Sequence, residues 1–434
     1  MWYESSIFYQ IYPLGLCGAP EINDGNLESR ILKLKEWIPH IKKLNMNAIY
    51  FSPVFESDRH GYDTKDFAKI DCRLGTNQDF KEVCRQIKSN GIRIVLDGVF
   101  NHVGRGFWAF QDVMKNRQDS PYCDWFYINF DGNSSFQDGF WYEGWEGHYE
   151  LVKLNLNNQA VRSHIFSCIQ MWIDEFDIDG LRLDVAYCLD PGFLRSLRSF
   201  CSAAKNDFLL LGEILFGDYK GIVNSAMLHS CTNYECYKGI YSSLNDMNLF
   251  EISYSLNRQF GIDNNAIYKN MHLLSFVDNH DVSRIASILN QKSHLPLAFA
   301  LLFGMPGIPC IYYGSEWGLE GAKQSGSDLS LRPSLTNPKW TELTSLISKL
   351  TKLHNENSAL HSGSYKVIHL TNRQLIFERS FHEETIWVGI NADSVQYMAN
   401  IAREFTCIDL LSGETLHAHD QILMHSYELF VWKL

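Results

Sequence analysis

Buried strands alternate with amphipathic helices along most of this 434-residue chain, and this order constrains the fold more than any other feature. Residues 48–52 and 92–97 are predicted strands, and apolar side chains at helical spacing lie between them. The order returns where an amphipathic helix over 161–176 precedes a strand over 178–184. Repeated units of this kind predict an α/β fold, most often a (β/α)8 TIM barrel at this length. The open doubly wound sheet is the alternative, but no glycine-rich nucleotide turn follows the first strand, over 6–12.

The remaining elements are expected at less regular intervals. A helix is predicted over 27–44, with an interruption at Pro39. One strand falls somewhere between 228 and 239, and the others are predicted over 208–213, 273–278 and 310–314. The uncharged stretch 295–315 is long enough to span a bilayer. Its prolines and glycines instead predict a buried helix, a turn and a buried strand, so we expect no membrane span.

The strand–helix order stops in two places, which suggests the domain organisation. Residues 103–157 are rich in Gly, Asn, Asp and aromatic residues and show no clear helical period. We predict an inserted subdomain here, after the third strand, with the barrel formed by 1–102 and 158–355. Short alternating apolar runs then predict an antiparallel β-sandwich over 356–434.

Composition excludes several classes of partner. The net charge is -12, from 50 acidic and 38 basic residues, without a long block of one sign. This disfavours nucleic acid or an anionic membrane surface as a partner. The 11 cysteines show neither disulfide-framework nor zinc-site spacing, and the N-terminal residues carry no basic signal-peptide region. We therefore expect free thiols in a reducing cytoplasm.

Polar motifs follow four of the predicted strands, at 97–102, 180–184, 212–214 and 276–281. They place carboxylates, histidines and an arginine at the ends of separate strands. In a barrel these ends meet at one mouth, where active sites lie. Converging carboxylates suit a reaction with a positively charged transition state, such as cleavage of a glycosidic bond between an acid and a nucleophile.

The residue types suggest which catalytic role each of these side chains has. Arg182 and Asp184 project to the same side of their strand, so the arginine is expected to lower the pKa of Asp184 and keep it ionised as a nucleophile. Glu213 follows an apolar strand, and a raised pKa there would suit an acid/base catalyst. Asp281 can orient sugar hydroxyls. Any one of these carboxylates alone could be a helix cap or an ion-pair partner, but their shared position favours catalysis.

In their order and spacing, the four motifs resemble the signature regions of the α-amylase family of retaining glycoside hydrolases. The resemblance covers nearly the whole chain, and implies that Asp184 is the nucleophile, Glu213 the general acid/base and Asp281 the stabiliser of the transition state. It also implies supporting residues around the cleaved sugar: Arg182 beside the nucleophile, His102 and His280 on sugar hydroxyls, Asp97 as a structural carboxylate, Tyr62 stacked beneath the ring, and Asp328 and Arg332 on the next sugar.

Lys153, within 152–155, and the segments 47–55 and 60–64 resemble the neopullulanase and cyclomaltodextrinase branch of the family. By this resemblance we expect Lys153 to be a substrate-binding residue. The resemblance also implies cleavage of α-1,4 bonds in malto-oligosaccharides and cyclodextrins, although the extra N-terminal domain usual in that branch is not seen before the first strand. Residues 185–188 lack the lysine–histidine pair of calcium-dependent α-amylases. With Lys153 in place of a carboxylate ligand, we expect neither a metal site nor a cofactor.

Other activities remain open on the same residues. An α-glucosidase or a transglycosylase would show the same motifs. The motifs also do not distinguish exo- from endo-acting enzymes, and they do not indicate the oligomeric state. A non-catalytic sugar-binding member is disfavoured because Asp184, Glu213 and Asp281 are all present. The aromatic residues of the inserted subdomain are either outer sugar platforms or its small core, namely Trp141, Tyr142, Trp145, His148 and Tyr149.

Overall fold

Eight parallel strands form the centre of the computed structural model, which describes residues 1–263, 265–401 and 403–434. Their order is β13-β12-β11-β5-β2-β1-β15-β14, and an isolated bridge between Thr232 and Leu274 joins the outer two, which closes the barrel. Almost every residue in them is buried. The strands are β1 (Phe8–Ile11), β2 (Ala48–Phe51), β5 (Arg93–Gly98), β11 (Gly180–Leu183), β12 (Leu209–Gly212), β13 (Ser230–Cys231), β14 (Leu274–Phe276) and β15 (Ile308–Tyr312).

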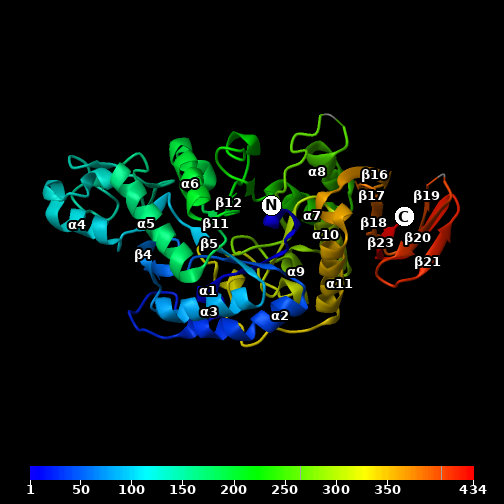
Figure 1. The fold of residues 1–434 in the computed structure, drawn as a ribbon, viewed down its shortest axis with the longest axis horizontal. Helices are drawn as coiled ribbons and strands as arrows, with labels where there is room; N and C mark the ends of the chain where they lie inside the picture. The colour runs from blue at the N-terminus through cyan, green and yellow to red at the C-terminus, as the bar shows by residue number, and fades with distance from the viewer. Residues whose placement is uncertain (264, 402) are drawn as a thin grey trace.

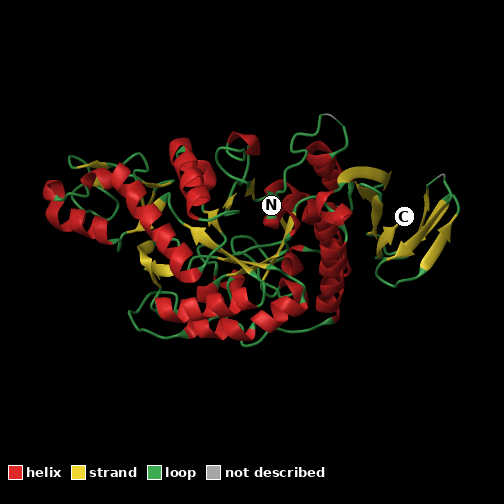
Figure 2. Cartoon of the chain, viewed as in Figure 1, coloured by secondary structure: helices red, strands yellow, loops and turns green. Residues whose placement is uncertain are grey.

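Helices surround this barrel (Figures 1 and 2), which confirms the predicted fold class. Their first turns follow from local sequence: Thr76 accepts a hydrogen bond from the Asp79 N–H, and Asp79 accepts one from the Thr76 N–H, which caps α3. Asn158 caps α5 in a similar way. The helices are α1 (Pro13–Leu16), α2 (Ile38–Lys43), α3 (Asn77–Ser89), α5 (Gln159–Phe176), α6 (Pro191–Ala204), α7 (Tyr234–Asn245), α8 (Phe250–Phe260), α9 (Ile285–Ile288), α10 (Leu295–Gly304), α11 (Glu342–Glu356) and α12 (Ser358–Ser362).

The single helix predicted over 27–44 is wrong. The structure has a 3-10 helix over Arg30–Glu36 and then the separate helix α2. Pro39 lies in the first turn of α2, where its missing N–H costs nothing, so the proline begins a helix instead of kinking one.

The inserted segment after the third barrel strand contains a helix that we did not predict, α4 (Trp108–Asn116). It packs Phe110 against Phe126 and Tyr142, so its apolar face is covered by aromatic rings. The segment also has a three-stranded sheet, in the order β6-β10-β9. The strands near and within it are β3 (Phe55–Ser57), β4 (Thr64–Ile70), β6 (His102–Gly104), β7 (Ile128–Asn129), β8 (Trp141–Tyr142), β9 (Gly144–Trp145) and β10 (His148–Lys153).

The C-terminal part forms the predicted antiparallel sandwich. A six-stranded sheet, β16-β17-β18-β23-β20-β21, and the pair β19-β22 enclose an apolar layer that includes Trp387, Met424 and Phe430. The strands are β16 (Ser364–Leu370), β17 (Gln374–Phe381), β18 (Glu384–Asn391), β19 (Tyr397–Asn400), β20 (Phe405–Asp409), β21 (Thr415–Ala418), β22 (Gln421–Met424) and β23 (Leu429–Lys433). The exact domain boundaries given above stay a prediction.

The uncharged stretch 295–315 contains α10, a turn and β15, as predicted. Residues from Leu297 to Gly304 are all buried, and α10 packs against α11, β18 and β23. In the part of the chain that the structure describes, no helix has the length and hydropathy needed to cross a membrane.

Candidate active site

One guanidinium group lies at the centre of the site. Arg182, in β11, is only 3% exposed. Its Nη1 donates to Asp97 Oδ1 and to Asp184 Oδ1, each at 2.9 Å, and its Nη2 lies 3.0 Å from Glu213 Oε1. Asp97 belongs to β5, Asp184 directly follows β11 and Glu213 directly follows β12. Because these strands are neighbours and parallel, their carboxyl ends bring three carboxylates to one arginine.

Glu213 has a second fixed contact, because the Val185 N–H donates to its Oε2 at 2.9 Å. Val185 has a φ of 39°, which is rare for a β-branched residue, and this turn directs its N–H at Glu213. Burial raises the pKa of Glu213 above its ordinary value, although Arg182 opposes the rise. The predicted direction is confirmed, and a carboxyl group that holds its proton this tightly suits a general acid.

The expectation for Asp184 is wrong in its net direction. Burial raises the pKa of Asp184 well above its ordinary value; Arg182 opposes this, but Glu213 and Asp97 add to the rise. The reason is that several buried carboxylates share one arginine. Asp184 and Glu213 therefore take up protons as a coupled pair, and one proton is readily held between them.

Asp281 lines the same cavity as Asp184 and Glu213, so the structure brings the three predicted catalytic carboxylates together. Its Oδ1 accepts a hydrogen bond from Arg332 Nη2 at 3.0 Å, and its Oδ2 lies 3.1 Å from His280 Nε2. Burial alone would raise the pKa of Asp281, but His280 and Arg332 hold it below its ordinary value. A carboxylate that stays ionised can stabilise positive charge on a sugar ring.

His280 is held at both ring nitrogens. The Gln10 amide donates to Nδ1 at 2.8 Å, which leaves the Nε2 proton for Asp281. Tyr62 stacks on the ring, with centroids 5.5 Å apart, and its hydroxyl contacts Nε2. Burial lowers the pKa of His280 to about 3, so the ring is neutral. Sequence reasoning missed Gln10, although a glutamine within the apolar first strand was a usable signal.

His102 presents a nitrogen without a partner beside the candidate nucleophile. Its buried Nε2 has no hydrogen-bond partner among the described residues and lies 3.8 Å from Asp184 Oδ2. Burial lowers the pKa of His102 to about 3, so this ring is neutral too. A neutral imidazole with one free nitrogen can bond a sugar hydroxyl, which is the role that the resemblance implies.

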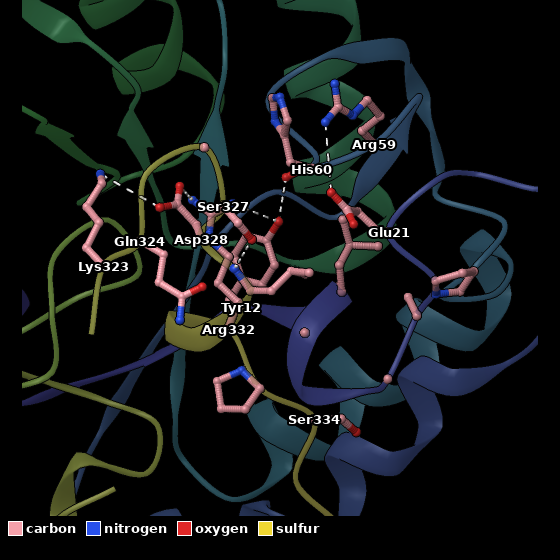
Figure 3. A pocket seen from close by; sticks show the side chains of 18 residues that line it. Tyr12, Glu21, Arg59, His60, Lys323, Gln324, Ser327, Asp328, Arg332 and Ser334 are labelled. Atoms are coloured by element: carbon pink, nitrogen blue, oxygen red, sulfur yellow. Dashed lines mark hydrogen bonds and ion pairs between the residues drawn. The ribbon is translucent and has the colours of Figure 1, made fainter. Parts of the chain in front are cut away.

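A cavity of about 660 Å³ lies above these groups, within the range of roughly 300–1,000 Å³ typical of small-molecule sites. Tyr62, His102, Asp328 and Arg332 also line it. A second cavity of about 620 Å³ adjoins the first, because Asp328 and Arg332 line both (Figure 3). Figure 3 draws the residues that line the second cavity, with Asp328 and Arg332 among them. Asp328 accepts a hydrogen bond from Arg332 Nη2 at 3.1 Å. Together the two cavities form one cleft.

Four predicted site residues do not line the cleft, namely Asp97, Lys153, Arg182 and His280. Asp97 is buried beneath it, where it accepts hydrogen bonds from the Tyr50 and Tyr62 hydroxyls at 2.9 and 3.0 Å. This fits a structural carboxylate. Lys153 directs its ammonium group to Glu143 at 2.6 Å. Its direct contact with sugar stays a prediction that this geometry does not favour.

The aromatic residues of the inserted segment divide between the two roles considered above. Trp145 and His148 line the cavity above the carboxylates, and their rings stack with centroids 5.7 Å apart. Tyr142 is fully buried in the core of the segment. Trp145 and His148 are therefore the candidates for sugar contact, and Tyr142 is part of the packing.

One group of possible metal ligands lies elsewhere, formed by Glu56, Asp71 and Cys72, whose ligand atoms lie within 4.8 Å of one another. Protein donors already occupy its carboxylates. Asp71 binds the Arg73 guanidinium at 2.8 and 2.7 Å, and Glu56 accepts hydrogen bonds from Asn23 and from the Cys72 N–H, each at 2.8 Å. A metal would have to displace these contacts. Calcium independence stays a prediction.

A closed barrel with three carboxyl groups gathered at the carboxyl ends of its strands is the arrangement expected of an enzyme that cleaves glycosidic bonds. Comparison with known proteins agrees. The model of the family "Alpha amylase, catalytic domain" matches residues 10–358. The chain therefore belongs to the α-amylase family and is a glycoside hydrolase.

Individual relatives cover nearly the whole chain. The intracellular maltogenic amylase of Bacillus subtilis is 28% identical over 463 residues, which cover 99% of this chain and 76% of the relative. The cyclomaltodextrinase of Thermoanaerobacter pseudethanolicus is 30% identical over 438 residues, which cover 91% of this chain and 71% of the relative. Among solved structures, a cyclic α-maltosyl-(1→6)-maltose hydrolase from Arthrobacter globiformis has a TM-score of 0.85 at 25% identity, covering 100% of this chain and 99% of that one.

Proposed function

We propose that this enzyme hydrolyses α-1,4-glucosidic bonds of small malto-oligosaccharides and cyclodextrins by double displacement, with retention of the anomeric configuration. The observation that carries the proposal is the shared guanidinium, which binds Asp184 through Nη1 and Glu213 through Nη2. Two carboxylates on the ends of one guanidinium lie close together. Retaining enzymes need such a pair, at roughly 5–5.5 Å, whereas inverting enzymes leave about 6.5–9.5 Å for a water molecule.

In the first displacement, Asp184 attacks the anomeric carbon while Glu213 protonates the glycosidic oxygen. The leaving oligosaccharide departs with that proton, and a covalent glycosyl ester forms at Asp184. The hydrogen bond from Arg182 fixes the direction of the Asp184 carboxylate. The Val185 N–H does the same for Glu213.

In the second displacement, Glu213 is a carboxylate and removes a proton from water. The water oxygen attacks the anomeric carbon from the face that the leaving group vacated, and the ester bond to Asp184 breaks. The sugar keeps its configuration, and both carboxyl groups return to their starting protonation states. Asp281 stays negative beside the ring and opposes the positive charge of both transition states.

The cleft suits a neutral sugar chain. Neutral His102 offers a hydrogen bond without adding charge, and Tyr62 and Trp145 offer aromatic faces. The names of the relatives, maltogenic amylase and cyclomaltodextrinase, support malto-oligosaccharides and cyclodextrins as substrates. The relative from Bacillus subtilis is called intracellular, which supports a cytoplasmic location for this enzyme too.

Hydrolysis of maltotriose by Glu213→Gln tests the proposal. The glutamine cannot donate the proton, so kcat should fall by about 10²–10⁴-fold. Glu235→Gln is the matched control, because Glu235 lies on α7 and pairs with Arg258 outside the cleft. Proton NMR of the first product should show the α-anomer. A β-anomer, or full activity of Glu213→Gln, would exclude this mechanism.

A further inference from the structure

A separate cavity of about 380 Å³ lies where the C-terminal sandwich packs against the barrel. His272 and Gly307 line it just before β14 and β15 begin, so it is at the end of the barrel opposite the carboxylates. The opposing wall comes from His361, on α12, and Arg379, on β17. The catalytic cleft shares no lining residue with it.

The cavity wall is strongly basic. Five of its side chains are basic, namely Lys269, His272, His361, Arg379 and His382. Among the described residues that line it, none is an aspartate or glutamate. The chain as a whole has 50 acidic and 38 basic residues, so a wall of this composition runs against the average charge of the molecule.

Arg379 is fully buried, and no carboxylate of the described residues pairs with it. Its Nε, Nη1 and Nη2 donate to the carbonyls of Ser364, Gly304 and Gly363 at 3.1, 2.7 and 3.0 Å. A guanidinium has five N–H groups, so two are left without an acceptor among the described residues. Burial without a counter-charge lowers the pKa of Arg379 to about 9. An uncompensated buried cation of this kind is costly, and an anion would relieve that cost.

The acidic groups near the cavity are already engaged. Glu384 binds Lys433 at 2.6 Å, and Glu4 binds the N-terminal ammonium group at 2.6 Å. The remaining neighbours are basic, because His354 on α11 faces the same histidines and arginine. Burial lowers the pKa of His272 and of His361, and the charge of Arg379 lowers both further. Glu4 opposes this fall in pKa at His272, and Glu384 opposes it at His361. A bound anion would raise both pKa values, so each imidazole can take up a proton as the anion binds.

We propose that this cavity binds a small oxyanion of the phosphate class, with Arg379, His272 and His361 as its main partners. Charge-assisted hydrogen bonds from a guanidinium and from imidazolium groups match the oxygens of such an anion. Since the wall includes residues of the barrel and of the C-terminal sandwich, the anion joins the two parts. Binding to the folded state alone stabilises that state against unfolding.

Calorimetric titration of the full chain with sodium phosphate, glucose 1-phosphate or sodium sulfate, against chloride at equal ionic strength, tests this site. We expect heat of binding and a rise in Tm for the oxyanions only. Tighter binding of glucose 1-phosphate would identify a phosphate ester, and tighter binding of phosphate would identify the free anion. Sulfate keeps its charge near neutral pH and in mild acid, so its affinity should increase as pH falls from neutral toward the lowered pKa values of His272 and His361, because the histidines take up protons.

Arg379→Gln removes a buried hydrogen-bonding group and carries a folding risk, so His361→Gln and His272→Gln are the decisive variants. Each should weaken sulfate binding at least tenfold and leave maltotriose hydrolysis unchanged. His417→Gln is the matched control, because His417 is exposed on β21. Oxyanion heats no larger than those of chloride, or wild-type affinity in the doubly substituted protein, would overturn the proposal.

Discussion

At the scale of single residues, the charge of Arg182 sets the protonation of the whole catalytic group. It contacts Asp97, Asp184 and Glu213 within 3.0 Å, and it opposes the rise in pKa that burial causes at each carboxyl group. The pH profile of the enzyme should therefore depend on this arginine as much as on the carboxylates themselves.

Only protonated Glu213 can donate to the leaving oxygen, so activity should fall as pH rises through its raised pKa. In Arg182→Met the opposing charge is gone, so the pKa values of Glu213 and Asp184 rise further. We expect both limbs of the kcat/KM profile on maltotriose to move to higher pH, with at least about 100-fold lower activity. Arg403→Gln, in the C-terminal sandwich, is the control. A lower activity with unmoved limbs would contradict the electrostatic role.

Gln10 is a positioning residue, because it acts through His280. Gln10→Met keeps the volume of the side chain but removes the donor to Nδ1 of His280. The ring loses its fixed tautomer, so kcat/KM on maltotriose should fall about tenfold. The free energy of unfolding should also fall, by about 1–3 kcal/mol, because Nδ1 of His280 stays buried without a partner. Gln111→Met, on the exposed face of α4, should change neither quantity. Unchanged kcat/KM in Gln10→Met would show that His280 needs no such support.

Some features of the site could be predicted from the sequence and others could not. Asp184, Glu213 and Asp281 each follow an apolar run, so a linear pattern locates them. The pKa of Asp184 depends on how many buried carboxylates contact Arg182, and only the three-dimensional structure shows that number. The hydrogen bond from the Val185 N–H to Glu213 could not be predicted from the sequence either, because it depends on the backbone angles of Val185.

At the scale of elements, Asp179 joins the starting ends of two barrel strands. It precedes β11, its carboxylate accepts the Ile94 N–H of β5 at 2.9 Å, and Lys88 of α3 lies 2.7 Å away. The side chain is 1% exposed. Burial would raise its pKa, but Lys88 and the Ile94 N–H hold the pKa of Asp179 below its ordinary value.

Asp179→Asn should lower the free energy of unfolding by about 3 kcal/mol at neutral pH, because it leaves Lys88 without its buried partner. A lowered folded-state pKa gives stability that is present above the unfolded pKa and is lost as pH falls through the folded pKa. The difference between the two proteins in denaturant unfolding should therefore shrink in acid. Asp177→Asn is the control, since Asp177 is 62% exposed and should cost under about 1 kcal/mol. Equal losses of unfolding free energy in both variants would contradict a stabilising role for the buried Asp179 carboxylate.

The errors in secondary structure have local causes. Apolar spacing over 27–44 suggested one helix, yet Pro39 could equally begin a helix, and spacing does not decide between these. Helix α4 was missed because it spans only Trp108–Asn116 and lies in a segment rich in Gly, Asn, Asp and aromatic residues, where so short an apolar pattern does not stand out. Tertiary contact with Phe126 and Tyr142 supplies what the local pattern lacks.

At the scale of the whole molecule, the barrel and the C-terminal sandwich meet at Gly304, the last residue of α10. A Cβ atom there would lie 2.9 Å from Val388 and 3.0 Å from Phe377, both in the sandwich. Since the two parts pack without room for one extra carbon, we expect them to unfold in a single transition.

Gly304→Leu should lower the free energy of unfolding by roughly 1–3 kcal/mol, because the side chain forces the two parts apart. KM for maltotriose should not change, since the cleft is at the other end of the barrel. Gly221→Leu is the matched control, because nothing lies within 4 Å of a Cβ atom at that position. A Gly304→Leu protein with the stability of the wild type would show that the barrel and the sandwich leave room for a side chain at this position.

Closure of the barrel has one further consequence. β13 has two residues. Among the described residues, its contacts with the β14 segment include the bridge from Thr232 to Leu274, the bond from the Asn233 N–H to the Leu274 carbonyl at 2.8 Å, and the bond from Ser230 Oγ to the His272 carbonyl at 2.6 Å. Glu213 follows β12, the neighbour of β13, and Asp281 follows β14 on the other side of the seam. Because so few contacts close the barrel here, we expect local opening to begin between β13 and β14. A bulky acceptor sugar would then enter by separating Glu213 from Asp281, while Asp97, Asp184 and Glu213 stay bound to Arg182.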